Sequence, residues 1–280
     1  MQVKAVVYGA QKFSEDLYQR ALTLVDTESA ARIKRFYKRD DACRTLIGRL
    51  LLRKVLNERG VASSDVTFGI TTAKKPYIVS INVYCAGFDF DLPLSIEATP
   101  ELHPPLGFNI THDNALIAIA VCEGVHHPPA YSIGIDVMKI RVPGRDTFAS
   151  FVHTVSDQLT AREYRLIFDA TQEEGLRRFF WMWTMKEAYT KALGIGLGFD
   201  FKRVEYDVPE EVIRVDGEVP KGWEFRKFEI MDNEDLYQGV VAQYVGGEEP
   251  ATISPVQLGN DWVVRYDAAS FAEEAIQAPQ

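Results

Sequence analysis

Residues 181–198 read WMWTMKEAYTKALGIGLG and combine a charged pair with an otherwise apolar helical pattern. Trp183, Glu187 and Lys191 follow one another at intervals of four residues, which places all three on one face of a helix. A glutamate one turn before a lysine is commonly an exposed pair worth about 0.2–0.5 kcal/mol. The apolar residues around this pair favour a second interpretation, in which it lies at the edge of a core or a cleft.

The elements on either side of this helix are predicted from capping residues and hydrophobic periodicity. Glycines at 194, 196 and 198 end the helix, which we expect over residues 173–193. Thr160 and Glu163 form the capping-box pattern that starts a preceding helix. The elements expected nearer the start are a strand at 3–8, a helix after Ser14, a helical stretch at 28–59 with a break near 38–41, two strands within 65–80, and adjacent strands at 115–122 and 131–138.

The order of these elements indicates an α+β chain built from two similar α/β halves, a pseudo-dimer within one polypeptide. Residues 1–130 contain a strand, a long helical stretch and further strands, and residues 131–280 contain a strand, helices and strands. We place the boundary between the halves there. Binding sites in such proteins commonly lie where two units meet, so we expect the active site in the cleft between the halves.

The totals are those of an ordinary globular protein. The chain has 280 residues, of which 46% are hydrophobic and 25% charged, and no run of 18 apolar residues that could span a membrane. The start, MQVKAVVYGA, is typical of a strand and not of a signal peptide. Cys43, Cys85 and Cys122 are far apart and form no CxxC, which favours a reducing compartment. We therefore expect a cytoplasmic protein.

The charge of the chain is unevenly distributed. The net charge of −9 argues against a general nucleic-acid binder. Residues 32–59 nevertheless hold ten Lys or Arg and three acids, a net charge of +7, which leaves −16 for the remainder. The basic segment is either a solvated helix face or a landing site for a polyanionic small molecule or an acidic protein.

Two carboxylates and two cationic or titratable groups form the candidate site. Asp136 stands at the end of the apolar strand IGIDVM, and Glu187 lies on the helix described above. Considered separately, Asp136 and His112 both have a structural interpretation. Asp136 is then an aspartate at the point where a strand leads into a turn, and His112 is a histidine with a structural role. Together with Lys191 and the basic segment, the two carboxylates suit a diphosphate substrate held with Mg²⁺, because carboxylate oxygens are the protein ligands this ion prefers.

Five blocks of the sequence occur in the order of a known family. They are RFYKRDDACRTLIGRLLLRK, KKPYI, FNITHD, GIDVMKI and WTMKEAYTKALGIGLG, and they run from about residue 32 to residue 200. With these blocks the chain resembles the Sfp-type 4′-phosphopantetheinyl transferases, most of all the broad-range eukaryotic type that activates aminoadipate reductase. The resemblance implies two similar halves with coenzyme A between them. It also implies transfer of 4′-phosphopantetheine from coenzyme A to a carrier-protein serine, with release of adenosine 3′,5′-bisphosphate.

The resemblance further implies roles for single residues. Asp136 and Glu187 would hold Mg²⁺, or Mn²⁺, on the diphosphate, and Glu187 or a metal-bound water that it orients would take the serine proton. Lys191 would neutralise the diphosphate, and His112 would contact the phosphates of coenzyme A. The other residues that the resemblance assigns to coenzyme A are Arg32 and Arg49 at the 3′-phosphate, Lys74 and Lys75 on the loop beside the nucleotide, and Asn109 and Thr111 of FNITHD.

The partners implied by the resemblance are apo carrier-protein domains. Those of aminoadipate reductase, fatty-acid synthase, and polyketide or non-ribosomal peptide synthetases are all expected substrates of a monomeric enzyme that binds neither nucleic acid nor membrane. Three positions depart from the family pattern. Met138 stands where many members have a second acid, Lys74-Lys75-Pro76 replaces GKP, and residues 82–107 form a longer insertion. The pattern leaves open which of the two lysines points inward.

Two other functions were weighed against the transferase. One is a protein that binds coenzyme A or carriers without catalysis, and the presence of Asp136, Glu187 and Lys191 argues against it. The other is a nucleotide-dependent enzyme such as a kinase. The glycines of GIGLG follow a helix, whereas a dinucleotide fingerprint lies between a strand and a helix, and no GxxxxGK[ST] occurs.

Overall fold

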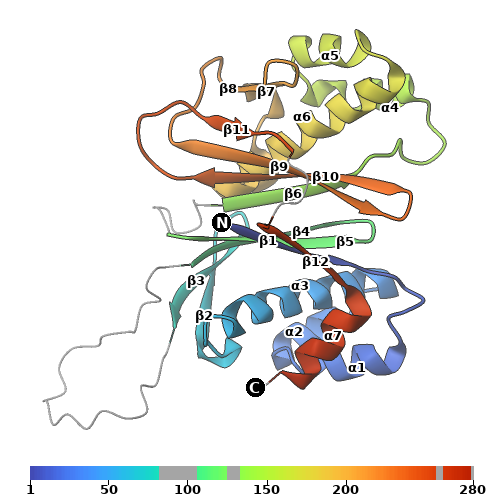
Figure 1. The fold of residues 1–280 in the computed structure, drawn as a ribbon, viewed down its shortest axis with the longest axis vertical. Helices are drawn as coiled ribbons and strands as arrows, with labels where there is room; N and C mark the ends of the chain where they lie inside the picture. Colours follow the sequence, from blue (N-terminus) through green and yellow to red (C-terminus); the bar gives the residue numbers. More distant parts are fainter. Residues whose placement is uncertain (82–105, 125–132, 257–260, 279–280) are drawn as a thin grey trace, which may run out of the picture.

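The computed structural model describes residues 1–81, 106–124, 133–256 and 261–278, and it consists of four layers (Figure 1). Two four-stranded sheets lie face to face, and a group of helices covers the outer face of each sheet. Apolar side chains fill the space between the sheets. This arrangement confirms the predicted α+β class with two similar halves. Within the described ranges, no helix is long and apolar enough to cross a membrane.

The first sheet has the strand order β12-β1-β5-β4, in which β1 pairs antiparallel with β5 and parallel with β12. Its strands are β1 (Gln2–Val7), β4 (Leu106–Asp113), β5 (Leu116–Glu123) and β12 (Val263–Asp267). The helices on its outer face are α1 (Glu15–Leu22), α2 (Thr27–Ile33), α3 (Arg39–Asn57) and α7 (Ala268–Gln277). A separate hairpin of β2 (Val66–Ile70) and β3 (Pro76–Ile81) follows the 3₁₀ turn η1 (Ser63–Asp65).

The helical stretch expected at 28–59 forms two helices, with a break close to the predicted one. The Asp26 side chain caps the start of α2, whose last residue is Ile33, and α3 begins at Arg39. The apolar stripe of α3 is fully buried against the first sheet; it includes Leu46, Ile47, Leu50, Leu51 and Val55. Because this stripe fixes the rotation of α3, it also fixes which way the arginines between its members face.

The second sheet has the order β11-β9-β10-β6, with β10 antiparallel to both β9 and β6. Its strands are β6 (Ile133–Lys139), β9 (Trp223–Asp232), β10 (Asp235–Tyr244) and β11 (Thr252–Ser254). The helices on its outer face are α4 (Phe148–Thr154), α5 (Ala161–Phe168) and α6 (Gln172–Leu193). The shorter elements are the hairpin of β7 (Val204–Asp207) and β8 (Val212–Val215) and the 3₁₀ turns η2 (Ser156–Gln158), η3 (Gly196–Gly198) and η4 (Phe201–Arg203).

Two sequence expectations are affected by the sheet topology. The strands predicted to be adjacent, β5 and β6, are in different sheets, because β1 and β4 occupy both edges of β5. They pack face to face through the core between the sheets. The boundary between 1–130 and 131–280 stays a prediction, although β12 and α7 return to the first half. The insertion expected at 82–107 lies outside the described residues, apart from its last two, which begin β4.

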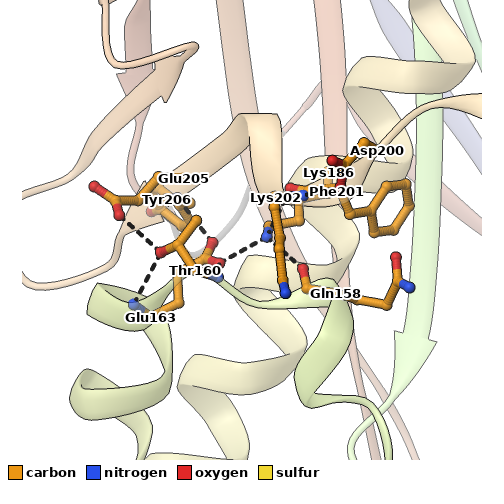
Figure 2. A network of polar contacts seen from close by, with 9 residues as sticks. All are labelled: Gln158, Thr160, Glu163, Lys186, Asp200, Phe201, Lys202, Glu205 and Tyr206. Atoms are coloured by element: carbon orange, nitrogen blue, oxygen red, sulfur yellow. Dashed lines mark hydrogen bonds and ion pairs between the residues drawn. The ribbon is translucent and has the colours of Figure 1, made fainter.

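A buried ion pair holds α6 against the elements around it (Figure 2). The Lys186 ammonium lies 2.6 Å from Glu163 Oε2, and both side chains are completely inaccessible to solvent. Lys186 also donates to the carbonyls of Gln158 and Phe201, at 2.8 and 3.0 Å. Glu163 closes the predicted capping box with Thr160. Burial lowers the pKa of Lys186 and raises that of Glu163, and each partner opposes the shift of the other.

Replacing one partner of this pair should strongly destabilise the fold. Lys186→Met leaves the Glu163 carboxylate buried without its cation, so we expect the free energy of unfolding to fall by about 3–5 kcal/mol. Denaturant unfolding followed by circular dichroism measures this change. The double variant Lys186→Met/Glu163→Gln removes the buried charge as well and should be more stable than Lys186→Met alone. Unchanged stability of Lys186→Met would show that the pair is not a structural anchor.

Candidate active site

Asp136 lies at the centre of a polar cluster between the two halves. Its side chain is 5% exposed, and its Oδ1 accepts from Lys191 Nζ at 2.6 Å and from Thr111 Oγ1 at 3.2 Å. Lys191 also donates to Thr111 Oγ1, at 3.2 Å. The second oxygen, Oδ2, is buried and has no hydrogen-bond partner among the described residues. Such a buried, unpaired carboxylate oxygen is uncommon and marks a position for a ligand.

Glu187 completes the acidic part of this cluster. It lies one turn before Lys191 on α6 and is half-buried. Burial raises the pKa of Glu187, the Asp136 carboxylate raises it further, and Lys191 opposes both effects. Burial likewise raises the pKa of Asp136, again opposed by Lys191. Two carboxylates that disfavour each other's ionisation, with one oxygen unpaired, form a site suited to a divalent cation.

Glycine 134 allows the two carboxylates to approach each other. A Cβ atom at this position would lie 2.1 Å from the carbonyl oxygen of Ala188 and 2.3 Å from the nitrogen of Ala192. The backbone of β6 therefore packs directly on α6, which no residue with a side chain would allow. This contact gives a physical reason for the glycine of GID, two residues before Asp136 in the same strand.

The edges of β4 and β6 lie side by side without a regular backbone ladder, and side chains of β4 connect them. The Ile135 N–H donates to Asn109 Oδ1 at 2.9 Å, and the Lys139 N–H donates to Asp113 Oδ2 at 2.7 Å. Both pairs are separated by 26 residues in sequence, so the strands keep one register. We call these two contacts the edge bonds. They place Thr111, which lies between them, beside Asp136.

A cavity of about 450 Å³ with several arginines adjoins the cluster on the side of the first half. The predicted residues Arg32, Arg49 and His112 line it together. Arg44 lines it too, with its Nε donating to the Asn114 carbonyl at 2.5 Å, and the sequence interpretation missed this residue. It belongs to the basic segment, but its contact with Asn114, 70 residues later, leaves no local signal in the sequence. Desolvation, Arg44 and Lys191 lower the pKa of His112, which favours the neutral ring.

A second cavity of about 350 Å³ begins at Asp113 and is mainly apolar. Its aromatic wall consists of Phe151, Phe179, Phe180 and Trp183. Met138, which replaces the second acid of many members, lines this cavity as well. The described residues contain no group of three or more His, Cys, Asp or Glu that could hold a metal ion. Protein carboxylates would therefore supply only part of a metal shell here.

The two adjacent lysines of the β2–β3 turn differ in direction. Lys75 is 8% exposed, and its ammonium donates to the carbonyls of Ile133 and Ala192 at 2.8 and 3.2 Å. Lys74 is exposed and adopts a left-handed backbone conformation with φ of 66°. Lys75 is thus the lysine that points inward. Neither residue is among the described residues that line the arginine-rich cavity.

Comparisons with known proteins agree with these features. The model of the 4′-phosphopantetheinyl transferase superfamily matches residues 132–243, and that of the 4′-phosphopantetheinyl transferase N-terminal region matches residues 12–124. The chain is 49% identical to 4′-phosphopantetheinyl transferase pptA of Paxillus involutus, over 99% of both chains. It is 29% identical to the mouse L-aminoadipate-semialdehyde dehydrogenase-phosphopantetheinyl transferase, over 75% of this chain and 65% of that one.

One solved structure is also similar over part of the chain. The holo-[acyl-carrier-protein] synthase of Thermotoga maritima aligns with a TM-score of 0.30 and 23% identity, covering 40% of this chain and 63% of that one.

The edge bond of Asn109 should contribute measurably to stability. Asn109→Leu keeps the approximate size of the side chain but leaves the buried Ile135 N–H without an acceptor, so we expect a loss of about 1–3 kcal/mol in the free energy of unfolding. Denaturant unfolding measures it. Asn57→Leu, at the half-exposed end of α3, is the control and should change stability by less than about 0.5 kcal/mol. Equal effects of the two substitutions would contradict the importance of the edge bond.

Proposed function

The chain belongs to the 4′-phosphopantetheinyl transferase superfamily, and we propose that it transfers the 4′-phosphopantetheine group of coenzyme A to a serine of apo carrier-protein domains. The observation that carries this proposal is that three sites meet at the end of β4. His112 lines the arginine-rich cavity, Thr111 belongs to the carboxylate cluster, and Asp113 lines the apolar cavity. Coenzyme A has three parts of matching chemistry: a phosphorylated nucleotide, a diphosphate and a largely apolar arm.

The carboxylate cluster is suited to hold Mg²⁺, or Mn²⁺, on the diphosphate. The unpaired Oδ2 of Asp136 and the carboxylate of Glu187 would be its protein ligands, with water and phosphate oxygens completing the shell. Such an ion would supply positive charge to the phosphoryl group as the bond to its leaving group breaks. Lys191 neutralises the same region from the other side of Asp136 and is held there by Thr111.

The chemical step needs an acceptor for the serine proton. Glu187 is the proposed base, directly or through a water molecule that it orients, because its raised pKa makes it a better proton acceptor than an ordinary carboxylate. The serine oxygen bonds to the phosphorus that carries pantetheine, the serine proton passes to Glu187, and adenosine 3′,5′-bisphosphate leaves. His112, with a lowered pKa, is neutral and donates or accepts a hydrogen bond at the phosphates.

In this proposal the two halves have different roles. Residues 1–130 hold the nucleotide, with Arg32 and Arg49 at the 3′-phosphate, and residues 131–280 supply Asp136, Glu187 and Lys191. The carrier is an acidic domain drawn toward the basic segment, and the name of the mouse relative suggests aminoadipate reductase as one such carrier. Since one chain carries both sides of the site, we propose that the enzyme acts as a monomer. Its cysteine pattern supports a cytoplasmic location.

Incubation with coenzyme A, Mg²⁺ and a panel of apo carrier domains tests the proposed function. The mass of each carrier should increase by one phosphopantetheine group per reactive serine, and a carrier with that serine replaced by alanine should stay unchanged. Binding of coenzyme A without any transfer would instead favour the non-catalytic binding protein. The rates for different carriers identify the preferred substrate.

The carboxylates should be essential for turnover and not for folding. We expect Glu187→Gln to fold normally, because the described residues make no hydrogen bond to this carboxylate, and to lose at least about 100-fold in kcat. Asp136→Ala should lose transfer entirely and weaken binding of Mn²⁺, followed by electron paramagnetic resonance. Binding of adenosine 3′,5′-bisphosphate should persist in both variants. Near wild-type transfer by Asp136→Ala would refute the metal assignment.

Arg49 should distinguish coenzyme A from dephospho-coenzyme A, which lacks the 3′-phosphate. A charge-assisted contact of this kind is worth about 1.5–3 kcal/mol, so Arg49→Ala should raise Kd for coenzyme A by about 10- to 150-fold. The Kd for dephospho-coenzyme A should change little. Arg59→Ala, at an exposed position of the same basic segment outside the cavity, is the calorimetric control. An equal rise in Kd for both ligands would show that Arg49 does not contact the 3′-phosphate.

A further inference from the structure

The turn between β2 and β3 is a tightly bonded loop that crosses from the first half to the second. Thr71 and Lys75 close it, with the Thr71 N–H donating to the Lys75 carbonyl at 2.9 Å and the Lys75 N–H donating to Thr71 Oγ1 at 3.0 Å. Lys74 in its left-handed conformation completes the turn. This geometry gives the Lys75 side chain a defined direction, into the protein and toward α6.

Lys75 bonds the turn to the backbone beside two residues of the carboxylate cluster. Ala192, whose carbonyl accepts from the Lys75 ammonium, directly follows Lys191, and Ile133, the other acceptor, comes three residues before Asp136. Ala192 is in the last turn of α6, where carbonyls lack partners within the helix and attract cations. Burial lowers the pKa of Lys75 to about 7, which reflects how completely the ammonium is removed from water.

A backbone contact reinforces this anchor. A Cβ atom at Gly196 would lie 3.1 Å from the Cβ of Ala73, and Gly196 has a left-handed φ of 68°. The turn therefore packs on the glycine segment that follows α6. This is a structural reason for one of the glycines of GIGLG, independent of any nucleotide fingerprint.

The hairpin residues next to this turn form a wall of the arginine-rich cavity. Phe68, Ile70 and Pro76 line this cavity opposite α3. Ile70 is 65% exposed and Phe68 is 37% exposed, so the wall presents apolar side chains that the protein itself does not cover. Inside the cavity the Phe68 ring contacts Phe108 edge-on, with 6.3 Å between the ring centroids. Ile70 and Pro76 directly flank the turn that Lys75 anchors, so the anchor and the wall are adjacent along the chain.

We infer that Lys75 is a positioning residue, which holds the β2–β3 wall of the nucleotide cavity in register with the carboxylate cluster and does not contact a phosphate of coenzyme A. The inference rests on the proposed function, since coenzyme A is the ligand whose nucleotide the wall would cover. A wall held in place before binding lowers the cost of ordering it around the ligand. Loss of the anchor should therefore weaken binding of the nucleotide while the chemistry at saturating coenzyme A continues.

Lys75→Met is the direct test, because it keeps most of the side-chain stem and removes the hydrogen bonds of the ammonium to the Ile133 and Ala192 carbonyls. We expect KM for coenzyme A and Kd for adenosine 3′,5′-bisphosphate to rise together by about tenfold, the effect of losing one to two buried hydrogen bonds. Dephospho-coenzyme A should be weakened by the same factor, kcat should change less than about twofold, and KM for the carrier should stay the same. In hydrogen–deuterium exchange, amides of residues 66–78 should exchange faster while those of α6 keep their protection.

Lys227→Met is the matched control. Lys227 is another buried lysine, 5% exposed, and it bonds Tyr206 and Glu211 in the second half, away from the cavity. Its replacement should lower the melting temperature and leave KM for coenzyme A unchanged, which separates general destabilisation from a change in the wall. If Lys75→Met proves too unstable to purify, Gly196→Ala acts on the same anchor from the other side and should produce the same faster exchange and higher KM.

Three results would overturn the inference. One is a much larger loss for coenzyme A than for dephospho-coenzyme A, which would make Lys75 a ligand of the 3′-phosphate. The second is unchanged exchange and unchanged KM in Lys75→Met. The third is the same rise in KM for Lys227→Met. A wild-type protein that neither binds coenzyme A nor modifies any carrier would contradict the proposed function itself, and the exchange experiment would still report whether Lys75 anchors the hairpin.

Discussion

The edge bonds between β4 and β6 are the constraint on which the rest of the site depends. The two sheets face each other, so these edge strands meet at the boundary of the halves without a backbone ladder of their own. Unpaired N–H groups at a buried boundary are costly, and Asn109 and Asp113 supply the missing acceptors from side chains. Their common register fixes Thr111 beside Asp136. A shift of one residue along either strand would turn Thr111 away from the carboxylate.

The helix that carries Glu187 and Lys191 needs a second constraint, because its rotation decides where both side chains point. Lys186, the neighbour of Glu187, is fixed on the opposite side by Glu163 and two carbonyls (Figure 2). Gly134 permits the close packing that brings Asp136 to Lys191. The charged groups on the two sides of α6 therefore have different roles. The Lys186 pair is fully hydrogen-bonded and structural, whereas one oxygen of the Asp136 pair has no partner among the described residues and is the proposed ligand of the metal ion.

The ends of helices and strands are largely predictable from the sequence, whereas contacts between residues far apart in the sequence are not. Caps and periodicity are local signals, so the C-terminal end of α6 follows from its glycines and the start of α5 from the capping box of Thr160 and Glu163. The grouping of Asp136, Glu187 and Lys191 follows from resemblance and from residue chemistry, since nothing in their spacing brings a strand to a helix 50 residues later. The pairing of β12 with β1 and the facing of β5 and β6 depend on side-chain packing across the whole chain. Arg44 was missed because its contact is with a turn distant in sequence, and the bond of Asp113 to Lys139 was not foreseen for the same reason.

The structure places the basic segment of the chain beside one of the two cavities. The basic segment makes up α3 and the end of α2, which border the cavity proposed for the nucleotide and not the aromatic cavity, which lies on the side of α6. Electrostatic attraction acts over about 10 Å at ordinary ionic strength, whereas contact with apolar walls acts only after docking. A ligand with a charged end and an apolar end would therefore be oriented by the first half before its apolar end contacts the second half. The two halves have similar folds but differ in charge and in the lining of their cavities. A ligand with two chemically different ends can therefore bind in one orientation, which two identical halves could not enforce.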